Sequence, residues 1–383
     1  MFSRQLRILL CATAVSSWPA VPLANGQDLL IGQVSSHTSP VLTANAKPLY
    51  AGINVYFDYV NARGGIGGRK VRLVNKDDEF VAVKMIELTK ELIADKNVLA
   101  LAGYQNTGGI NELSKQNIPG EAGIAMIAPF QGDKAIVSAA NFFPFRSGYP
   151  DEVTALIKEA KFTEKKKVVV IYQNMTFGPA MAKLAREQAR EQGLNVVEYV
   201  PIETAPQDLG VVAGVVAAVV KEAPNAVIVL LGGQHVTELL RQMKNAPALD
   251  GMQIYLMSIA PVQEVVKAVG EQKARGVVIA QAVPYPFSAT LPLVGEYQKL
   301  MKQYAPNEPL SFASLEGFVV AKITVEALKR ASPRPTREKV LKALNTMGEY
   351  DLGGVYVKYS PKARNGWGGV DLTVIGANGK LLR

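Results

Sequence analysis

Residues 61–78 read NARGGIGGRKVRLVNKDD, and this stretch decides the fold. Glycine tolerates a left-handed backbone, so Gly64-Gly65 predicts the end of a helix that we expect over Lys47–Ala62. The run that follows predicts a strand over Lys70–Asn75, and Asp77-Asp78 marks its end. A helix, a turn and a strand in this order are typical of parallel sheets covered by helices.

The same alternation continues along the chain in two series of similar size. The first has expected strands at Leu29–Val34, Lys70–Asn75, Val98–Gly103 and Ile124–Ala128, and helices at Lys47–Ala62, Val81–Asp95 and after Gly109. The second has expected strands at Lys167–Tyr172, Val196–Ile202, Ala226–Leu231, Gln253–Met257 and Gly276–Ala282, and helices at Asp151–Lys161, Gly178–Gln192, Asp208–Glu222 and Val236–Asn245. We therefore expect an α/β protein of two Rossmann-like units, with its ligand at the carboxyl ends of the strands.

The chain is expected to close with further helices and a strand pair. The helices are Leu293–Tyr304, Phe312–Arg330 and one opened by Pro335-Thr336, and the strand pair lies near Val355–Tyr359 and Leu372–Ile375.

Composition bounds the class of protein. With 383 residues, of which 48% are apolar and 20% charged, the chain can bury a core and is long enough for two domains. The net charge of +9 is spread out, and its densest basic run, Lys165–Lys167, is typical of a solvated strand entrance, so we expect no nucleic-acid partner. Apolar runs such as Val211–Val220 fall short of the about 20 residues of a membrane span.

The N-terminus has the layout of an export signal. Arg4 and Arg7 precede an apolar stretch from Ile8 to Val15, and a segment of prolines and small residues follows. We expect residues 1–26 to be a signal peptide cleaved near residues 24 to 26. Cleavage would remove Cys11, the one cysteine, so the mature chain would form no disulfide and use no thiol.

Familiar catalytic and metal-binding motifs are missing from the sequence. It has no Walker loop, no Gly-x-Ser-x-Gly and no His-Glu-x-x-His. The glycines at 64–68 follow a helix and precede a strand, the reverse of a phosphate loop. His37 and His235 are the two histidines, both expected in loops after strands, so we expect neither a metal nor a cofactor. Asp77-Asp78 could pair as acid and base, but a turn or capping role is favoured because neighbours on a strand face opposite ways.

At this point the residues resemble a known family, the type I periplasmic binding proteins of the leucine/isoleucine/valine-binding branch, which serve ATP-driven (ABC) importers. The stretch from Ala51 through the Gly-Gly-Ile turn to Asp77-Asp78 is similar to that branch's first helix, turn and acidic strand end. The similarity continues through Ala102-Gly103, Met126–Pro129, Phe177-Gly178 and Leu239–Gln242.

The resemblance implies two lobes joined by three crossover strands. These would fall near Arg146–Gly148, near Ala282–Pro284 and near Asp371. The N-terminal lobe would then be 27–147 plus 284–370 and the C-terminal lobe 148–283 plus 371–383. It also implies a periplasmic monomer that binds a small molecule, closes by hinge motion and delivers it to a membrane permease.

By resemblance, the ligand's carboxylate is held by Thr107, next to Asn106, and by the turn Phe130-Gln131-Gly132. Phe177 is the aromatic wall, and Gln234 and His235 belong to the second-lobe loop. Ile259 stands where relatives carry the acid that pairs with an amino acid's ammonium. Because an aliphatic side chain cannot neutralise that charge, we expect a carboxylate or carbonyl compound with an apolar or aromatic body.

Alternatives stay open at this stage. A shifted register that places Glu316 or Asp78 in the cleft would restore binding of branched-chain amino acids. A ligand sensor of the same fold and an enzyme that uses His235 with a carboxylate are the other hypotheses.

Overall fold

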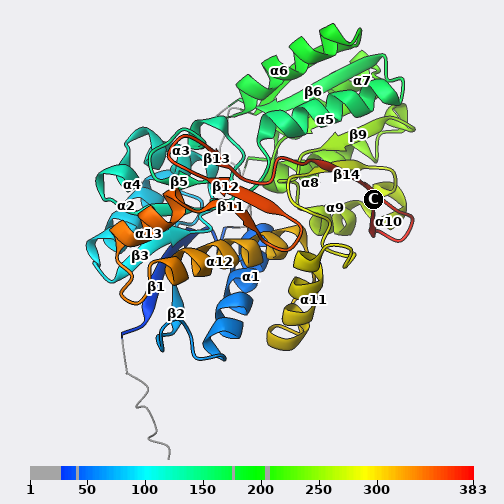
Figure 1. Cartoon of the computed structure of the whole chain (residues 1–383). Coiled ribbons are helices and arrows are strands. Elements are labelled where there is room, and N and C mark those ends of the chain that lie inside the picture. The colour runs from blue at the N-terminus through cyan, green and yellow to red at the C-terminus, as the bar shows by residue number, and fades with distance from the viewer. Residues whose placement is uncertain (1–26, 40–42, 175–176, 203–207) are drawn as a thin grey trace, which may run out of the picture.

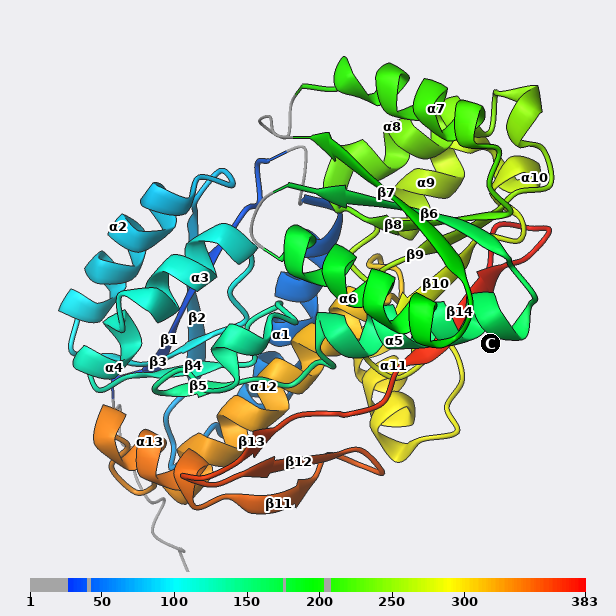
Figure 2. The ribbon, with the colours of Figure 1, turned by 90° about the horizontal axis from the view of Figure 1, so that it is seen from above.

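The computed structural model describes residues 27–39, 43–174, 177–202 and 208–383. These residues form two α/β lobes that lie side by side (Figures 1 and 2). Within those ranges no helix combines the length and apolarity needed to cross a bilayer.

The first lobe is a five-stranded parallel sheet between helices. Its strand order is β2-β1-β3-β4-β5. The strands are β1 (Leu29–Ser35), β2 (Val71–Asp77), β3 (Val98–Ala102), β4 (Ala125–Ile127) and β5 (Phe142–Phe143), and the helices are α1 (Thr43–Asn61), α2 (Ala82–Ala94), α3 (Thr107–Lys115) and α4 (Ile118–Glu121). The helix expected after Gly109 begins earlier, at Thr107.

Three later helices return to this lobe: α11 (Pro292–Tyr304), α12 (Phe312–Arg330) and α13 (Arg337–Asn345). Helix α12 crosses α1 at two glycines that let the backbones approach. A Cβ atom on Gly52 would lie 1.9 Å from the Ser314 carbonyl oxygen, and one on Gly317 would lie 2.0 Å from that of Leu49. Hydrogen alone fits at both positions, so this contact fixes how α12 presents its N-terminus.

The second lobe is a seven-stranded sheet in the order β15-β14-β10-β9-β8-β6-β7. Its strands are β6 (Lys167–Gln173), β7 (Asn195–Ile202), β8 (Ala226–Leu230), β9 (Gln253–Leu256), β10 (Val278–Gln281), β14 (Asp371–Ile375) and β15 (Leu381–Leu382). The first five are parallel, and β14 and β15 are antiparallel additions. The helices are α5 (Tyr149–Phe162), α6 (Gly178–Glu191), α7 (Val211–Glu222), α8 (Gly233–Met243), α9 (Val262–Val269) and α10 (Glu271–Ala274).

Two expectations about the secondary structure were wrong. The segments near Val355–Tyr359 and Leu372–Ile375 do not pair with each other. Strand β12 (Tyr356–Tyr359) instead pairs with β11 (Gly348–Asp351) and β13 (Arg364–Asn365) in a small antiparallel sheet, while β14 pairs with β10. Also, His235 is not in a loop but in the first turn of α8.

Three segments connect the lobes and meet at Ser147. They are residues 144–148 between β5 and α5, 282–291 between β10 and α11, and 366–370 between β13 and β14. The Ser147 amide donates to the Ala282 carbonyl oxygen (3.2 Å), and its hydroxyl donates to the Trp367 carbonyl oxygen (2.9 Å). A single residue therefore holds the three connections side by side.

Candidate functional site

The loop after β1 is fastened by the aspartates that end β2. The Asp77 carboxylate accepts hydrogen bonds from the backbone amides of His37 (3.1 Å) and Thr38 (3.0 Å). Asp78 is fully buried and accepts a bond of 2.8 Å from the Asn106 side-chain amide. The expected turn role of this pair is confirmed, and Asp78 does not line the cavity between the lobes.

The side chain of Asn106 makes its hydrogen bonds within the first lobe. Its side-chain oxygen accepts the Gly109 amide (3.2 Å) and caps α3, while its side-chain nitrogen binds Asp78. Its φ of 105° lies in the left-handed region, which a non-glycine residue adopts only when its surroundings hold it there. Both ends of the amide are thus used in shaping the loop before Thr107.

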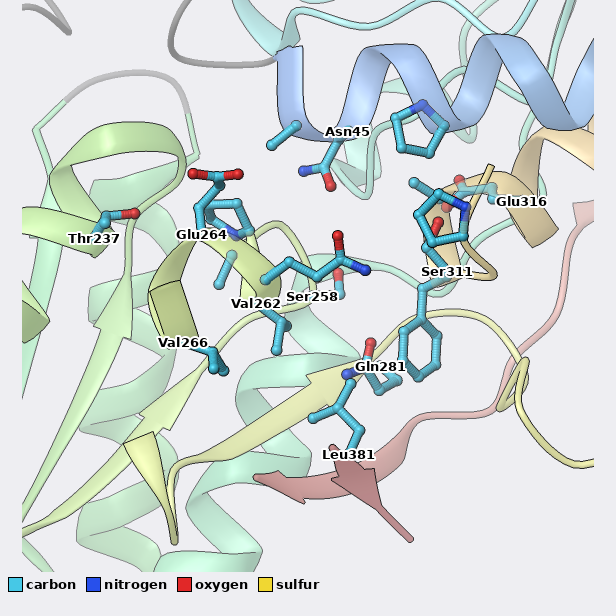
Figure 3. A pocket seen from close by; sticks show the side chains of 18 of the residues that line it. Asn45, Thr237, Ser258, Val262, Glu264, Val266, Gln281, Ser311, Glu316 and Leu381 are labelled. Atoms are coloured by element: carbon cyan, nitrogen blue, oxygen red, sulfur yellow. The ribbon is translucent and has the colours of Figure 1, made fainter. Parts of the chain in front are cut away.

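A cavity of about 1280 Å³ lies between the lobes near the connecting segments. From the first lobe it is lined by the N-terminal turns of α1 and α12, and from the second lobe by α8, α9 and β15. Figure 3 shows Asn45 of α1, Glu316 of α12 and Ser311, the N-cap of α12, facing Val262 and Val266 of α9. Because both lobes contribute walls, a change in their relative position would open or close this space.

The floor of the cavity holds a buried chain of charged and polar groups. Arg146, from the first connecting segment, donates through Nη2 to the Ser258 hydroxyl, and its guanidinium lies 4.3 Å above the Phe130 ring. Ser258 in turn donates to Glu152 through its amide (2.8 Å) and its hydroxyl (2.9 Å). On the other side, Arg146 Nε lies 3.9 Å from Glu316 Oε1. These linked groups therefore extend from α12 in the first lobe to α5 and the turn after β9 in the second.

Burial raises the pKa of both acids among these linked groups, Glu316 and Glu152. Desolvation raises the pKa of Glu316 to about 7, although the Arg146 guanidinium opposes the rise. Desolvation likewise raises the pKa of Glu152 to about 7, opposed by Arg146 and by the bonds from Ser258. Both carboxyl groups can therefore gain or lose a proton near neutral pH.

Part of this hydrogen-bonding capacity is unused among the described residues. Arg146 Nε and Nη1 and Glu316 Oε1 are buried and have no hydrogen-bond partner there. A buried polar atom without a partner is costly, so such atoms gain from a ligand that can pair with them. The floor thus offers two donors on a cation and one acceptor on an acid.

Two of the residues expected from sequence line this cavity. Phe130 covers Arg146, and Gln234 stands in the first turn of α8. Gln131 and Gly132 line a separate hollow of about 830 Å³ on the first connecting segment. Gly132 packs so closely there that a Cβ atom would lie 2.7 Å from the Tyr149 ring.

Thr107 and Phe177 both contact Tyr149, which lies at the start of α5. The Thr107 hydroxyl lies 3.5 Å from the Tyr149 hydroxyl, and the Phe177 ring packs on the Tyr149 ring with centroids 4.5 Å apart. The structure therefore brings these two expected residues together across the lobes, although neither lines the 1280 Å³ cavity.

His235 and Ile259 have internal contacts. The buried His235 imidazole lies 3.2 Å from the Asp208 carbonyl oxygen, and burial lowers its pKa. Ile259 packs between the cores of both lobes, and its carbonyl oxygen accepts a bond of 3.4 Å from Asn45 of α1. Ile259 thus helps to join the lobes.

Sequence reasoning missed Arg146, Ser258 and Glu152 as parts of the site. Arg146 was placed at a crossover and given no binding role. The sequence does carry one signal of this role, because Arg146 is a lone charged residue directly after the apolar run Phe142–Phe145. Among the described residues, no group of three or more His, Cys, Asp or Glu side chains is arranged to hold a metal ion.

Comparisons with known proteins agree with this architecture. A curated protein of Pseudomonas aeruginosa named amino acid binding protein is 26% identical over 253 residues, which is 64% of this chain and 64% of that protein. The match thus spans just under two thirds of that relative's length. Two crystal structures are 25% identical: an extracellular ligand-binding receptor from Verminephrobacter eiseniae (TM-score 0.84, 93% of this chain and 100% of that one) and a substrate-binding periplasmic protein from Ralstonia solanacearum (TM-score 0.85, 93% and 99%).

A family model described as periplasmic binding protein matches residues 29–380. This range contains all three connecting segments and, apart from β15, every helix and strand of both lobes. The chain therefore belongs to the type I periplasmic binding proteins.

Proposed function

We propose that this chain is the substrate-binding component of an ABC importer of the branched-chain amino acid type. It captures a small solute between its lobes in the periplasm, as a monomer, and delivers it unchanged to a membrane permease. The observation that carries this proposal is a cavity walled by both lobes next to their three connections. The lobes we propose are 27–147 with 284–370, and 148–283 with 371–383, after an export signal at 1–26.

In this proposal, ligand binding shifts the population of the protein from an open to a closed arrangement of the lobes. A ligand that contacts both walls stabilises the closed arrangement by its differential affinity for the two states. Arg146 and Ser258 lie near the connecting segments, so they move less than the outer walls, while the contact between Arg146 and Glu316 loosens as the lobes separate. The floor then acts as a fixed polar anchor, and α1 and α9 act as the moving walls.

The favoured ligand is a carboxylate with an apolar body. Arg146 supplies the cation, and its Nε and Nη1 atoms, which have no hydrogen-bond partner among the described residues, can each donate to a carboxylate oxygen. Above the floor, the apolar walls suit a hydrocarbon body. Because these donors are covered in the present arrangement, the ligand reaches them as the lobes separate.

A second candidate is an amino acid, and Glu316 favours it. The aliphatic Ile259 is the reason to expect another ligand, but Glu316 lines the cavity, and its Oε1 has no hydrogen-bond partner there, only the Arg146 Nε 3.9 Å away. An ammonium group placed there would be neutralised, and it would hold Glu316 in its charged form. The name of the Pseudomonas aeruginosa relative points the same way.

Calorimetry with a matched pair of ligands tests both candidates. Leucine and 4-methylpentanoate share a carboxylate and a side chain, and only leucine carries an ammonium group. Binding of 4-methylpentanoate at least as tightly as leucine supports the carboxylate class. Tighter binding of leucine, weakened at least about tenfold by E316Q while 4-methylpentanoate is unaffected, supports the amino acid.

The same complexes test whether the chain transforms its ligand. His235, the base of the enzyme hypothesis, is buried against a backbone carbonyl. We therefore expect mass spectrometry to recover each ligand with an unchanged mass after prolonged incubation. Any product that appears with the wild type and is lost in H235N would contradict the proposal.

A further inference from the structure

We propose that the cavity has a second, apolar compartment, formed by Tyr285, Phe287 and Phe312 with Val266 and Leu381, that takes an acyl or aryl tail larger than the side chain of leucine. This inference rests on the proposed function, because it treats the compartment as the continuation of the ligand-binding floor. It narrows the substrate class to solutes with a polar head and an extended apolar tail.

Three aromatic rings form one cluster on the cavity wall. The Tyr285 and Phe287 centroids are 5.3 Å apart, those of Phe287 and Phe312 are 6.0 Å apart, and those of Tyr285 and Phe312 are 6.2 Å apart. All three contacts are edge-to-face, the arrangement that aromatic pairs prefer. Phe287 is 42% exposed and lines the cavity, so its ring has surface to offer a ligand.

The cluster is tied to the second lobe by a hydrogen bond. The Tyr285 hydroxyl donates to the Leu381 carbonyl oxygen at 2.6 Å, which fixes β15 beside the rings. Figure 3 shows Leu381 of β15 and Val266 of α9 on the same wall of the cavity, with Gln281 between this region and Ser258. Apolar groups from the connecting segment, α9, α12 and β15 thus surround one region beside the polar floor.

The size of the cavity supports an extended ligand. At about 1280 Å³ it exceeds the roughly 300–1,000 Å³ that ordinary ligand pockets enclose. A leucine-sized molecule anchored at Arg146 would fill only part of this volume and leave the aromatic faces in contact with water. A longer tail covers them, and burial of each methylene adds a similar increment of binding.

The test is calorimetry with two homologous series, straight-chain carboxylates from butanoate to decanoate and primary alkanols from butanol to decanol. The alkanols lack the carboxylate, so they probe the compartment without the proposed head contact. We expect affinity in each series to rise by about fourfold per methylene up to at least octanoate or octanol. F287A and V266T should lower the affinity for the long members and leave butanoate unchanged.

F162A is the matched control, because Phe162 is 84% exposed at the end of α5 and does not line the cavity. It should leave both series unchanged. If the affinity of the alkanols rises with chain length and the carboxylates do not bind, the compartment is supported and the proposal of a carboxylate ligand is refuted. If the carboxylates bind with no dependence on chain length, or if neither series binds, the compartment is refuted. An equal effect of F162A and F287A also refutes it.

Discussion

Replacing Arg146 with methionine keeps the length of the side chain and removes the one cation at the cavity floor. The guanidinium lies between Glu316 and Ser258, and Ser258 is bonded to Glu152. Removing one partner of a buried ion pair costs about 3–5 kcal/mol of unfolding free energy, because the remaining charge stays buried without compensation. We expect a loss of that size at pH 8, where both carboxyl groups of the wild type are largely ionised.

The loss should depend on pH. Glu152 and Glu316 have a pKa of about 7 in the folded protein, so both hold protons at pH 5 and need no cation. R146M should then cost far less at pH 5 than at pH 8, and R146M/E316Q should recover part of the loss at pH 8. Urea denaturation at both pH values measures these differences. The exposed pair of Arg241 and Glu238 provides the control R241M, which should change little at either pH. An equal loss at pH 5 and pH 8, or a loss at pH 8 below about 1 kcal/mol, would refute this account of the floor.

Further predictions concern the acid and the helix contact. The folded pKa of Glu316, about 7, lies above the ordinary value of 4.5, so its contribution to stability is complete below pH 4.5 and declines as the pH rises to 7. The melting temperature of the wild type should therefore fall relative to that of E316Q across this window, and a constant difference would contradict the burial of Glu316. G52A places a methyl group against the Ser314 carbonyl oxygen and should cost about 3 kcal/mol in urea denaturation. Its control, G214A, adds a methyl group within α7 where nothing lies within 4 Å, and should stabilise by about 0.5–1 kcal/mol; equal effects of the two would contradict the close helix contact.

Local patterns predicted most of the secondary structure. The stop at Gly64-Gly65 and the run after Lys70 gave α1 and β2 nearly at their observed bounds, because glycine conformation and β-branching act on neighbouring residues. Strand pairing near the C-terminus was predicted wrongly, because β12 pairs with β11 and β13, its neighbours in the chain, whereas β14 pairs with the distant β10. Nothing near Tyr356–Tyr359 shows that it pairs with β11 and β13 rather than with β14. The short helix α9 was missed, although its valines at 262, 265, 266 and 269 have the spacing of one helix face.

The site was predicted less well than the fold. Phe130 and Gln234 line the cavity, and both were expected from the resemblance to the family. The floor depends on longer-range contacts: Arg146 and Ser258 are 112 residues apart in the chain. Glu316 entered the sequence reasoning only as an alternative, because nothing in a helix of buried residues distinguishes a cavity acid from a core acid.

Closure of the lobes over a bound solute is the central claim, and a distance measurement across the cleft tests it most directly. In a C11S background, spin labels at V83C on α2 and K183C on α6 report on the two lobes, because both positions are exposed. Double electron–electron resonance is recorded with and without saturating leucine, 4-methylpentanoate or octanoate, whichever binds by calorimetry. The account predicts a shorter and narrower distance distribution with the bound ligand. An unchanged distribution with a ligand that binds would contradict it.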